Sequence, residues 1–288
     1  MKVGVIVFGS LPAGVKQIVN KLQFHLTPKH ELVGMEIEKG TGTARYKELN
    51  INSDSPYLSD SMLVMSAYPG DDKWEEAFSA VDTAVVIGNA EAKEKWETYL
   101  AGHSSIRSLF VPVSIFNDIE GSVSSLGYDT AVNSIVDNIL RVKDTINSLK
   151  YDKPRLFGFS IDGSPSTKML EDISNAGDGH FFSPHFADDE IEALKGRIES
   201  SFTEWNTSSV LVYSAASAGL VKEKVIDNLN VDFKYTEVDE ALCMGTNPTA
   251  IDRILANDLT DEILSWVKLE QVTGQLAVQT DGIAFRNR

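Results

Sequence analysis

The segment Val3-Gly4-Val5-Ile6-Val7-Phe8-Gly9-Ser10-Leu11-Pro12-Ala13-Gly14 opens this 288-residue chain. Its first six residues are apolar and mostly β-branched, which predicts a buried strand. A turn containing glycine and proline follows, and a helical pattern comes next. Six further short apolar runs are predicted to be buried strands: Leu32–Ile37, Ala84–Ile87, Leu109–Val113, Leu156–Ile161, Val210–Tyr213 and Leu276–Gln279. Strands that alternate with helices predict an α/β protein with mostly parallel sheets.

Three segments have the apolar periodicity of a helix between these strands. The clearest is Ala131–Leu149, and Asp129-Thr130 offers cap oxygens ahead of it. The other two are Asp188–Phe202 and Ala250–Leu269. Two polar stretches are expected to be irregular: Asn50–Asp72 as a surface loop and Ser174–Pro184 as turns. The four tryptophans lie at helical positions and are expected to anchor a core or an interface.

The composition excludes several classes of partner. With 26 Lys+Arg against 42 Asp+Glu, the net charge of −16 argues against nucleic acid, which is bound by lysine and arginine. The apolar runs are shorter than the ~18 residues of a membrane span, so no membrane is expected. Cys243 is the single cysteine, which fits a reducing compartment. Because no signal-peptide pattern precedes the first strand, we expect a cytoplasmic protein.

The turn from Phe8 to Gly14 is the first candidate site. Ligands of open α/β sheets gather at the carboxyl ends of the strands, and backbone N–H groups before a helix can hold a phosphate. Lys16 adds a positive charge early in the helix. The spacing does not make a Walker motif, and a plain strand-to-helix turn explains the same residues.

Three other segments carry polar groups that could form a site. Lys39–Arg45 places Arg45 beside two glycines, which suits phosphate binding as well as a solvated arginine. Asp118, after the predicted strand Leu109–Val113, could orient a water or a metal. His180 and His185 lack a third ligand nearby, so both are expected at the surface and no metal site is expected.

Two longer segments resemble a known family. Ser125-Leu126-Gly127-Tyr128-Asp129-Thr130-Ala131-Val132-Asn133, continuing to Arg141–Thr145, is similar to a segment of the phosphofructokinases that opens a long helix. Gly245–Ala256 resembles that family's Gly-Gly-Ser/Thr-Pro…Asp-Arg-Ile-Leu-Ala run. The order of the remaining strands also fits, so the resemblance covers essentially the whole chain.

The resemblance implies a fold, an activity and an assembly. The fold would be two Rossmann-like three-layer α/β/α domains: residues 1–130 with 245–273 as the larger, nucleotide-side domain, and 131–244 with 274–288 as the smaller, sugar-phosphate-side domain. The reaction would transfer a phosphoryl group from ATP or pyrophosphate, with Mg²⁺, to the 1-hydroxyl of fructose 6-phosphate. The assembly would be a tetramer or a dimer of dimers.

The positions that match the family's working residues are mostly changed. Phe116 falls where the resemblance places the general base of the catalytic loop, and a phenyl ring cannot accept a proton. Loss of a positioned base typically costs ~10²–10⁴-fold in rate. Ala90 falls at the metal-side carboxylate, with Glu91 beside it. On the sugar-phosphate side, the resemblance implies an arginine at Ser164 and a glutamate at Ala215 or Ala216. It also implies a histidine at Ala241, an arginine at Met244 and another arginine near Tyr235.

A partial set of site residues remains. Asp118 matches the second carboxylate of the family's catalytic loop, and Arg45 matches an arginine of its phosphate loop. Arg155 matches an arginine that reaches the sugar phosphate of a neighbouring subunit. On the nucleotide side, the remaining cofactor-binding positions are Gly9, Gly14, Lys16, Gly88 and Glu91.

This combination favours a pseudoenzyme with a regulatory or structural role. It would be a homo-oligomer, as a dimer or tetramer, or a hetero-oligomer with an active phosphofructokinase. One alternative is a phosphotransferase or ligand-binding protein with an altered substrate, which uses ATP or pyrophosphate with Mg²⁺ only if it is active. Another is a pure assembly role, in which the surfaces matter and the cleft does not.

Overall fold

The computed structural model describes residues 1–9, 12–26, 29–49, 66–68, 74–102, 106–147, 151–204, 206–244 and 247–287. The chain divides into two compact units. Unit 1 comprises Met1–Asp129 and Thr246–Arg288, and unit 2 comprises Thr130–Gly245. Both are α/β units with a largely parallel sheet, as predicted.

A seven-stranded sheet forms the centre of unit 1, in the order β11-β10-β5-β4-β1-β2-β3. The inner strands are parallel, and the two outermost, β3 and β11, are antiparallel to their neighbours. The inner strands are almost fully buried, which explains their continuous apolar sequences. The bounds are β1 (Lys2–Val7), β2 (Glu31–Ile37), β3 (Ala44–Glu48), β4 (Thr83–Gly88), β5 (Arg107–Pro112), β10 (Gly274–Gln279) and β11 (Gly282–Asn287).

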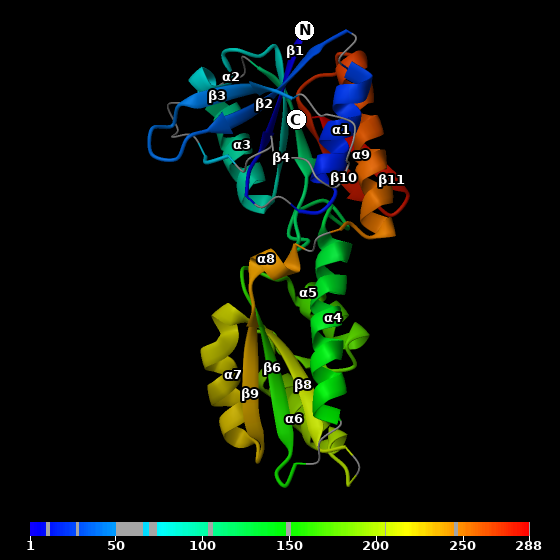
Figure 1. The fold of residues 1–288 in the computed structure, drawn as a ribbon. Helices are drawn as coiled ribbons and strands as arrows, with labels where there is room; N and C mark the ends of the chain where they lie inside the picture. Colours follow the sequence, from blue (N-terminus) through cyan, green and yellow to red (C-terminus); the bar gives the residue numbers. More distant parts are fainter. Residues whose placement is uncertain are drawn as a thin grey trace. The chain divides into compact units, whose positions relative to one another are not determined.

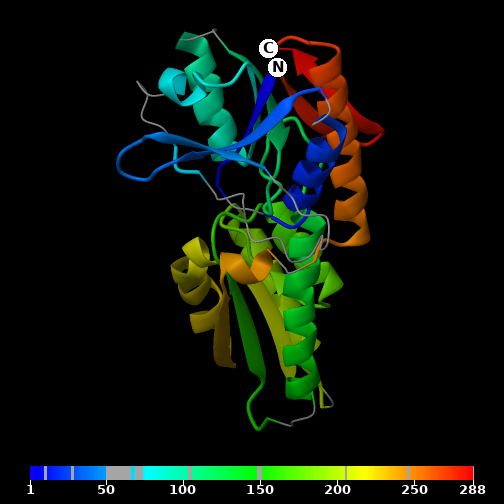
Figure 2. The same cartoon turned by 45° about the horizontal axis from the view of Figure 1, so that its top comes forward.

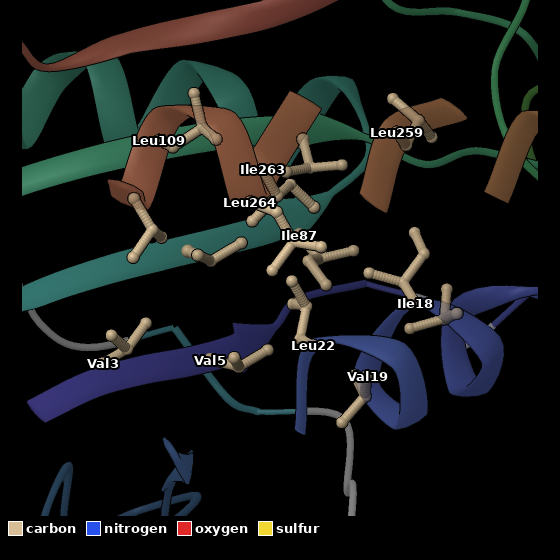
Figure 3. Packing of buried hydrophobic residues seen from close by; sticks show 14 of the residues in the cluster. Val3, Val5, Ile18, Val19, Leu22, Ile87, Leu109, Leu259, Ile263 and Leu264 are labelled. Atoms are coloured by element: carbon tan, nitrogen blue, oxygen red, sulfur yellow. The ribbon is translucent and has the colours of Figure 1, made fainter. Parts of the chain in front are cut away.

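Helices cover both faces of this sheet (Figures 1 and 2). On one face, α1 (Val15–Leu26) and α9 (Ala250–Lys268) lie side by side over the strands. Figure 3 shows Val3, Ile87 and Leu109 of the strands in the same cluster as the leucines and isoleucines of these two helices. On the other face, α2 (Trp74–Phe78) and α3 (Ala90–Gly102) contribute to a second, aromatic-rich cluster.

Unit 2 is built on a four-stranded parallel sheet in the order β7-β8-β6-β9. Its helices α6 and α7 share an apolar cluster with β6 and β8. The strands are β6 (Arg155–Ile161), β7 (His180–Phe181), β8 (Ser208–Ser214) and β9 (Asp232–Val238). The helices are α4 (Tyr128–Asn147), α5 (Thr167–Ala176), α6 (Asp188–Ser201), α7 (Ala218–Lys224) and α8 (Glu240–Cys243), with 3-10 turns η1 (Ala215–Ser217) and η2 (Ile226–Asn228).

The structure confirms the seven predicted strands and the three predicted helices within a few residues at each end. Four further strands were not predicted: β3, β7, β9 and β11. The polar stretch Ser174–Pro184 contains the end of α5 and the short strand β7 between its turns, while most of Asn50–Asp72 lies outside the described residues.

Two expectations are corrected. Asp129 and Thr130 do not precede the long helix, because α4 already begins at Tyr128; Asp129 instead accepts a hydrogen bond from Thr249. Residues 274–288 were expected in the smaller domain but belong to unit 1, because β10 pairs with β5 and β11 pairs with β10.

The tryptophans that the structure describes are core residues, as expected. Trp74, Trp96 and Trp266 are 3%, 1% and 1% exposed, and all three lie in unit 1. Trp205 is outside the described residues. Across the described helices, none is both long and apolar enough to cross a membrane.

Candidate functional site

The carboxyl edge of the unit 1 sheet gathers most of the predicted site residues. The strands β1, β4 and β5 are parallel, so the residues that follow them meet at one edge. Phe8 N–H donates to Ile87 O at 2.9 Å, and Val113 N–H donates to Gly88 O at 2.9 Å. The hairpin register that pairs Ile37 with Ala44 brings the start of β3 to the same edge. These contacts place the turn after each of these strands beside that of its neighbour.

The first turn begins at Gly9, which has a φ of 79°. A Cβ at this position would lie 2.9 Å from Nδ2 of Asn89, so the side chain of Asn89 sits against the turn. Asn89 Oδ1 accepts a hydrogen bond from Ala92 N–H at 3.1 Å, which caps the start of α3. The two residues after Gly9 lie outside the described part. Gly14 directly precedes α1, and Lys16 lies in the first turn of that helix.

The second turn lies between Gly88 and Glu91. Gly88 allows α3 to approach closely, since a Cβ there would come within 2.4 Å of the Ala92 Cβ. Ala90 follows and offers no metal ligand. Glu91 is exposed in the first turn of α3, and its Oε1 lies 3.5 Å from Nζ of Lys95 in an i,i+4 ion pair. In this turn, Asn89 therefore caps α3 and Glu91 forms a surface ion pair.

The third turn, after β5, carries Phe116 and Asp118. Its backbone is held by two serines: Phe116 N–H donates to Ser114 Oγ at 3.1 Å, and Ser125 Oγ donates to Ser114 O at 2.7 Å. Asn117 adopts a left-handed φ of 53° between them. The phenyl group of Phe116 is only 9% exposed, whereas Asp118 is exposed. The loop is thus well ordered by its own contacts, and its buried side chain is apolar.

Arg45 lies at this edge but on a strand. It is the second residue of β3, and its Nη2 donates to Glu38 Oε1 at 2.8 Å across the hairpin. Both side chains are exposed, at 58% and 39%. The glycine-rich segment before Arg45 forms the hairpin turn that brings the two charges together.

A segment that the sequence did not single out, residues 66–68, docks on the same edge. Ser66 N–H donates to Val7 O at 2.7 Å, and Ile37 N–H donates to Ser66 Oγ at 2.8 Å. Tyr68 stacks on Phe8 with ring centroids 5.0 Å apart, and Nζ of Lys95 lies 4.8 Å above its ring. Burial, and then Glu91, raise the pKa of the Tyr68 phenol. The sequence did carry a signal for it, since the apolar run Met62–Met65 directly precedes it inside the stretch that was expected to be a surface loop.

The two long segments that carry the family resemblance meet in unit 1. Gly127 N–H donates to Oδ1 of Asp252 at 2.8 Å, and Asp252 is 1% exposed. Thr249 caps α9 by accepting from Asp252 N–H, and its Oγ1 also pairs with Asp129 at the start of α4. Residues 120 and 125 positions apart thereby fix the starts of two long helices, and these matched residues stabilise the scaffold.

The carboxyl edge of the unit 2 sheet is acidic in its described part. Asp162 follows β6, while Asp239 and Glu240 follow β9. Burial, and then the charges of Glu240, Asp239 and Asp162, raise the pKa of the Cys243 thiol to about 12. Those three carboxylates therefore all lie close enough to Cys243 to affect the pKa of its thiol. Ser164, at the position where the resemblance implies an arginine, adds no charge.

Arg155 lies at the opposite, amino end of the unit 2 sheet. Its guanidinium makes two contacts to Oδ2 of Asp232, at 2.8 Å from Nε and 2.7 Å from Nη2. Its face lies 3.9 Å from the ring centroid of Tyr151. Because these partners hold the guanidinium within its own unit, Arg155 acts here as a link between β6 and β9.

The histidines do not form a metal site. His185 is exposed as predicted, but His180 is half-buried on β7, and burial lowers the pKa of its imidazole. Across the whole described part of the chain, no three His, Cys, Asp or Glu side chains are grouped to hold a metal ion. Near Ala90, the carboxylate of Glu91 is taken by Lys95. The methyl group of Ala90 therefore cannot supply the carboxylate through which the family resemblance implies that Mg²⁺ is held.

A scan against protein-family models matches residues 77–267 to the model described as Phosphofructokinase. The chain belongs to the phosphofructokinase family. The match spans all of unit 2 and part of unit 1, and it includes the third turn and both long segments. The predicted family membership is thus confirmed.

Known phosphofructokinases are distant relatives of this family member. It is 25% identical over 212 residues to ATP-dependent 6-phosphofructokinase 2 of Bacteroides thetaiotaomicron, covering 71% of this chain and 63% of that protein. It is 30% identical over 154 residues to ATP-dependent 6-phosphofructokinase 1 of Thermus thermophilus, covering 52% and 46%. The matched regions thus span about half to under two thirds of these phosphofructokinases.

Solved phosphofructokinases share the fold over nearly the whole chain. Pichia pastoris phosphofructokinase in the T-state superposes with a TM-score of 0.76 at 13% identity, covering 99% of this chain and 36% of that one. Pyrophosphate-dependent phosphofructokinase from Marinobacter aquaeolei gives 0.74 at 13% identity, covering 99% and 82%. At such identities the similarity establishes the fold, and the predicted architecture is confirmed.

Proposed function

We propose that this phosphofructokinase-family protein is a pseudoenzyme with a structural or regulatory role, working as a homo-oligomer or with an active phosphofructokinase in the cytoplasm. One observation carries the proposal: the buried side chain of the third turn is the phenyl ring of Phe116, 9% exposed, at the general-base position implied by the resemblance. Phosphoryl transfer depends on positioning and on charge stabilisation. A phenyl ring supplies neither a proton acceptor nor a charge.

The charges at the carboxyl edges of the two sheets also support a pseudoenzyme. In unit 1, Arg45 is paired with Glu38, and Glu91 is paired with Lys95. In unit 2, the described carboxyl edge carries Asp162, Asp239 and Glu240, where a sugar phosphate would need cations. Like charges at a phosphate site oppose binding.

A second candidate is a ligand-binding protein with a changed, less charged ligand. Tyr68 favours it, because its ring stacks beside the first turn and its buried hydroxyl has no hydrogen-bond partner among the described residues. Arg45, Glu91, Asp118 and Lys16 are the polar residues that this candidate would use. A flat polar ligand could use the stacked ring and the phenol, with ATP or pyrophosphate and Mg²⁺ as cofactors only in an active protein.

Ligand binding separates these candidates. We expect ATP, pyrophosphate and fructose 6-phosphate, each with Mg²⁺ at millimolar concentration, to leave the melting temperature of the purified protein unchanged. A ligand at 100 times its Kd would stabilise by about 2.7 kcal/mol, which a thermal-shift assay resolves. If one of them raises the melting temperature, Tyr68→Ala and Asp118→Asn tell which residues hold it. A saturable shift that disappears with Tyr68→Ala would replace the pseudoenzyme proposal by the ligand-binding one.

A further inference from the structure

Pairs of aspartate followed by glycine are positions at which a protein chain can modify its own backbone. The amide nitrogen of the glycine attacks the side-chain carboxyl carbon of the aspartate, because glycine has no Cβ that hinders the approach. An N–C bond forms, a C–O bond breaks and one water leaves, which closes a five-membered succinimide ring. Water then opens the ring at either carbonyl and leaves aspartate or isoaspartate. The chain has three such pairs: Asp162-Gly163, Asp178-Gly179 and Asp281-Gly282.

The fold holds Asp178-Gly179 in an unreactive arrangement. The side chain of Asp178 is 98% exposed, so exposure alone would favour this pair. However, Nζ of Lys143 binds its Oδ2 at 2.9 Å, and Gly179 N–H donates to Ser174 O at 2.8 Å. Moving the glycine nitrogen onto the carboxyl carbon would break both of these hydrogen bonds, which has a free-energy cost. The reaction at this exposed pair is therefore suppressed.

The pair Asp281-Gly282 is restrained by the hairpin of β10 and β11. Asp281 lies in the turn between the two strands, and Gly282 is the first residue of β11. Gly282 faces Gln279 in the antiparallel ladder, directly beside the turn. Attack by the Gly282 nitrogen would rotate a residue that the ladder fixes. This pair is therefore protected as well.

The pair Asp162-Gly163, in contrast, is arranged for the reaction. Asp162 N–H donates to Val238 O at 3.0 Å, which fixes Asp162 at the end of β6. Gly163 N–H donates to Oδ1 of Asp162 at 2.8 Å, so the nitrogen already lies beside the carboxyl group that it would attack. In the described part of the chain, this carboxylate has no ion pair and no backbone carbonyl accepts from Gly163 N–H. Both residues are exposed.

We propose that Asp162-Gly163 is a self-modification site of the folded protein, where the backbone isomerises to isoaspartate through a succinimide. The product adds one methylene group to the chain directly after β6, and it moves a carboxylate at the carboxyl edge of the unit 2 sheet. The new carboxylate belongs to the class that isoaspartyl methyltransferases methylate with S-adenosylmethionine. This inference does not depend on whether the protein is a pseudoenzyme or a ligand-binding protein.

Peptide mapping of the aged, full-length protein tests the site. The folded protein is incubated at near-neutral pH, and isoaspartate is located by chromatography, by fragmentation in the mass spectrometer and by methylation with an isoaspartyl methyltransferase. Isoaspartate is expected at Asp162, with Asp178 and Asp281 at background. In guanidinium chloride, the three pairs should react at similar rates, because the contacts that distinguish them are lost. If the folded protein forms as much isoaspartate at Asp178 or Asp281 as at Asp162, the proposal is wrong.

Two substitutions at the same exposed position separate the chemistry from the surroundings. Asp162→Glu should abolish the product in this peptide, because a glutamate would have to close a six-membered ring, which forms far more slowly. Asp162→Asn should give the same succinimide faster, with ammonia as the leaving group and a change in peptide mass. Circular dichroism checks that both variants are folded. A folded Asp162→Asn protein that does not deamidate here would overturn the proposal, and this outcome leaves the proposed function untouched.

Discussion

Replacing Asp252 by alanine is expected to lower the free energy of unfolding of unit 1 by about 2–4 kcal/mol. The carboxylate is 1% exposed, and its Oδ1 accepts the hydrogen bond from Gly127 N–H. Without it, a buried backbone donor loses its partner, and the first turn of α9 loses a negative charge that favours its N-terminus. The change would loosen the junction that holds the starts of α4 and α9.

Tryptophan fluorescence during urea unfolding measures this effect. Trp74, Trp96 and Trp266 are buried in unit 1, so their emission follows that unit. Asp258→Ala is the matched control, because Asp258 is exposed on the same helix and should change the free energy by less than about 0.5 kcal/mol. Equal effects of the two variants would contradict a structural role for the buried carboxylate.

Gly127→Ala is expected to destabilise unit 1 by about 3 kcal/mol or more. Gly127 has a φ of 98°, a region that residues with a Cβ rarely adopt. The added Cβ would also lie 2.4 Å from the Cβ of Pro12, and neither the proline ring nor the backbone can give way cheaply. The variant therefore combines backbone strain with a steric clash at the turn before α1.

Gly196→Ala is a comparison variant for which the opposite effect on stability is expected. Gly196 lies inside α6, and a Cβ there would meet nothing within 4 Å. Alanine in a helix interior is favoured over glycine by about 0.5–1 kcal/mol, so this variant should be slightly more stable. The pair is compared by circular dichroism in urea. A Gly127→Ala protein as stable as the wild type would show that the turn has another conformation.

The sequence predicts the inner strands of the fold, because strands that are buried on both faces have continuous apolar sequences. The central strands, such as β1 and β4, are buried on both faces and read as continuous apolar runs. The edge strands were missed for the same reason. β9 reads Asp-Phe-Lys-Tyr-Thr-Glu-Val and is largely exposed, so neither an apolar run nor a clean alternation marks it. Likewise, only the sheet pairing shows that β10 and β11 belong to unit 1.

The candidate site is less predictable, because it depends on contacts between distant segments. The resemblance drew attention to Phe116 and Ala90, and the structure shows what surrounds them. It could not indicate that Arg45 is held by Glu38, or that Tyr68 stacks on Phe8 beside the first turn. It also did not indicate that Gly127 N–H donates a hydrogen bond to Asp252, which lies 125 positions later in the chain. Each of these is a tertiary contact without a local pattern.

These contacts bear on the proposal that the family scaffold is kept here without the family's reaction. The residues around Gly127 and Asp252, which carry the family resemblance, fix the starts of two helices. The positions that would do the chemistry carry a phenyl ring and a methyl group, at Phe116 and Ala90. On this proposal, the residues that stabilise the fold differ from those at the catalytic positions, so the second set can change while the first is kept.

The most direct test is turnover of fructose 6-phosphate by the purified, full-length wild-type protein, with either ATP or pyrophosphate and with Mg²⁺. The Bacteroides thetaiotaomicron enzyme, a relative at 25% identity, serves as the positive control with ATP in the same coupled assay. Without the base, a rate at least ~10²–10⁴-fold below that control is expected, and the loss of the metal carboxylate should bring it to the assay background. Turnover within tenfold of the control, with either phosphoryl donor, would contradict the pseudoenzyme account.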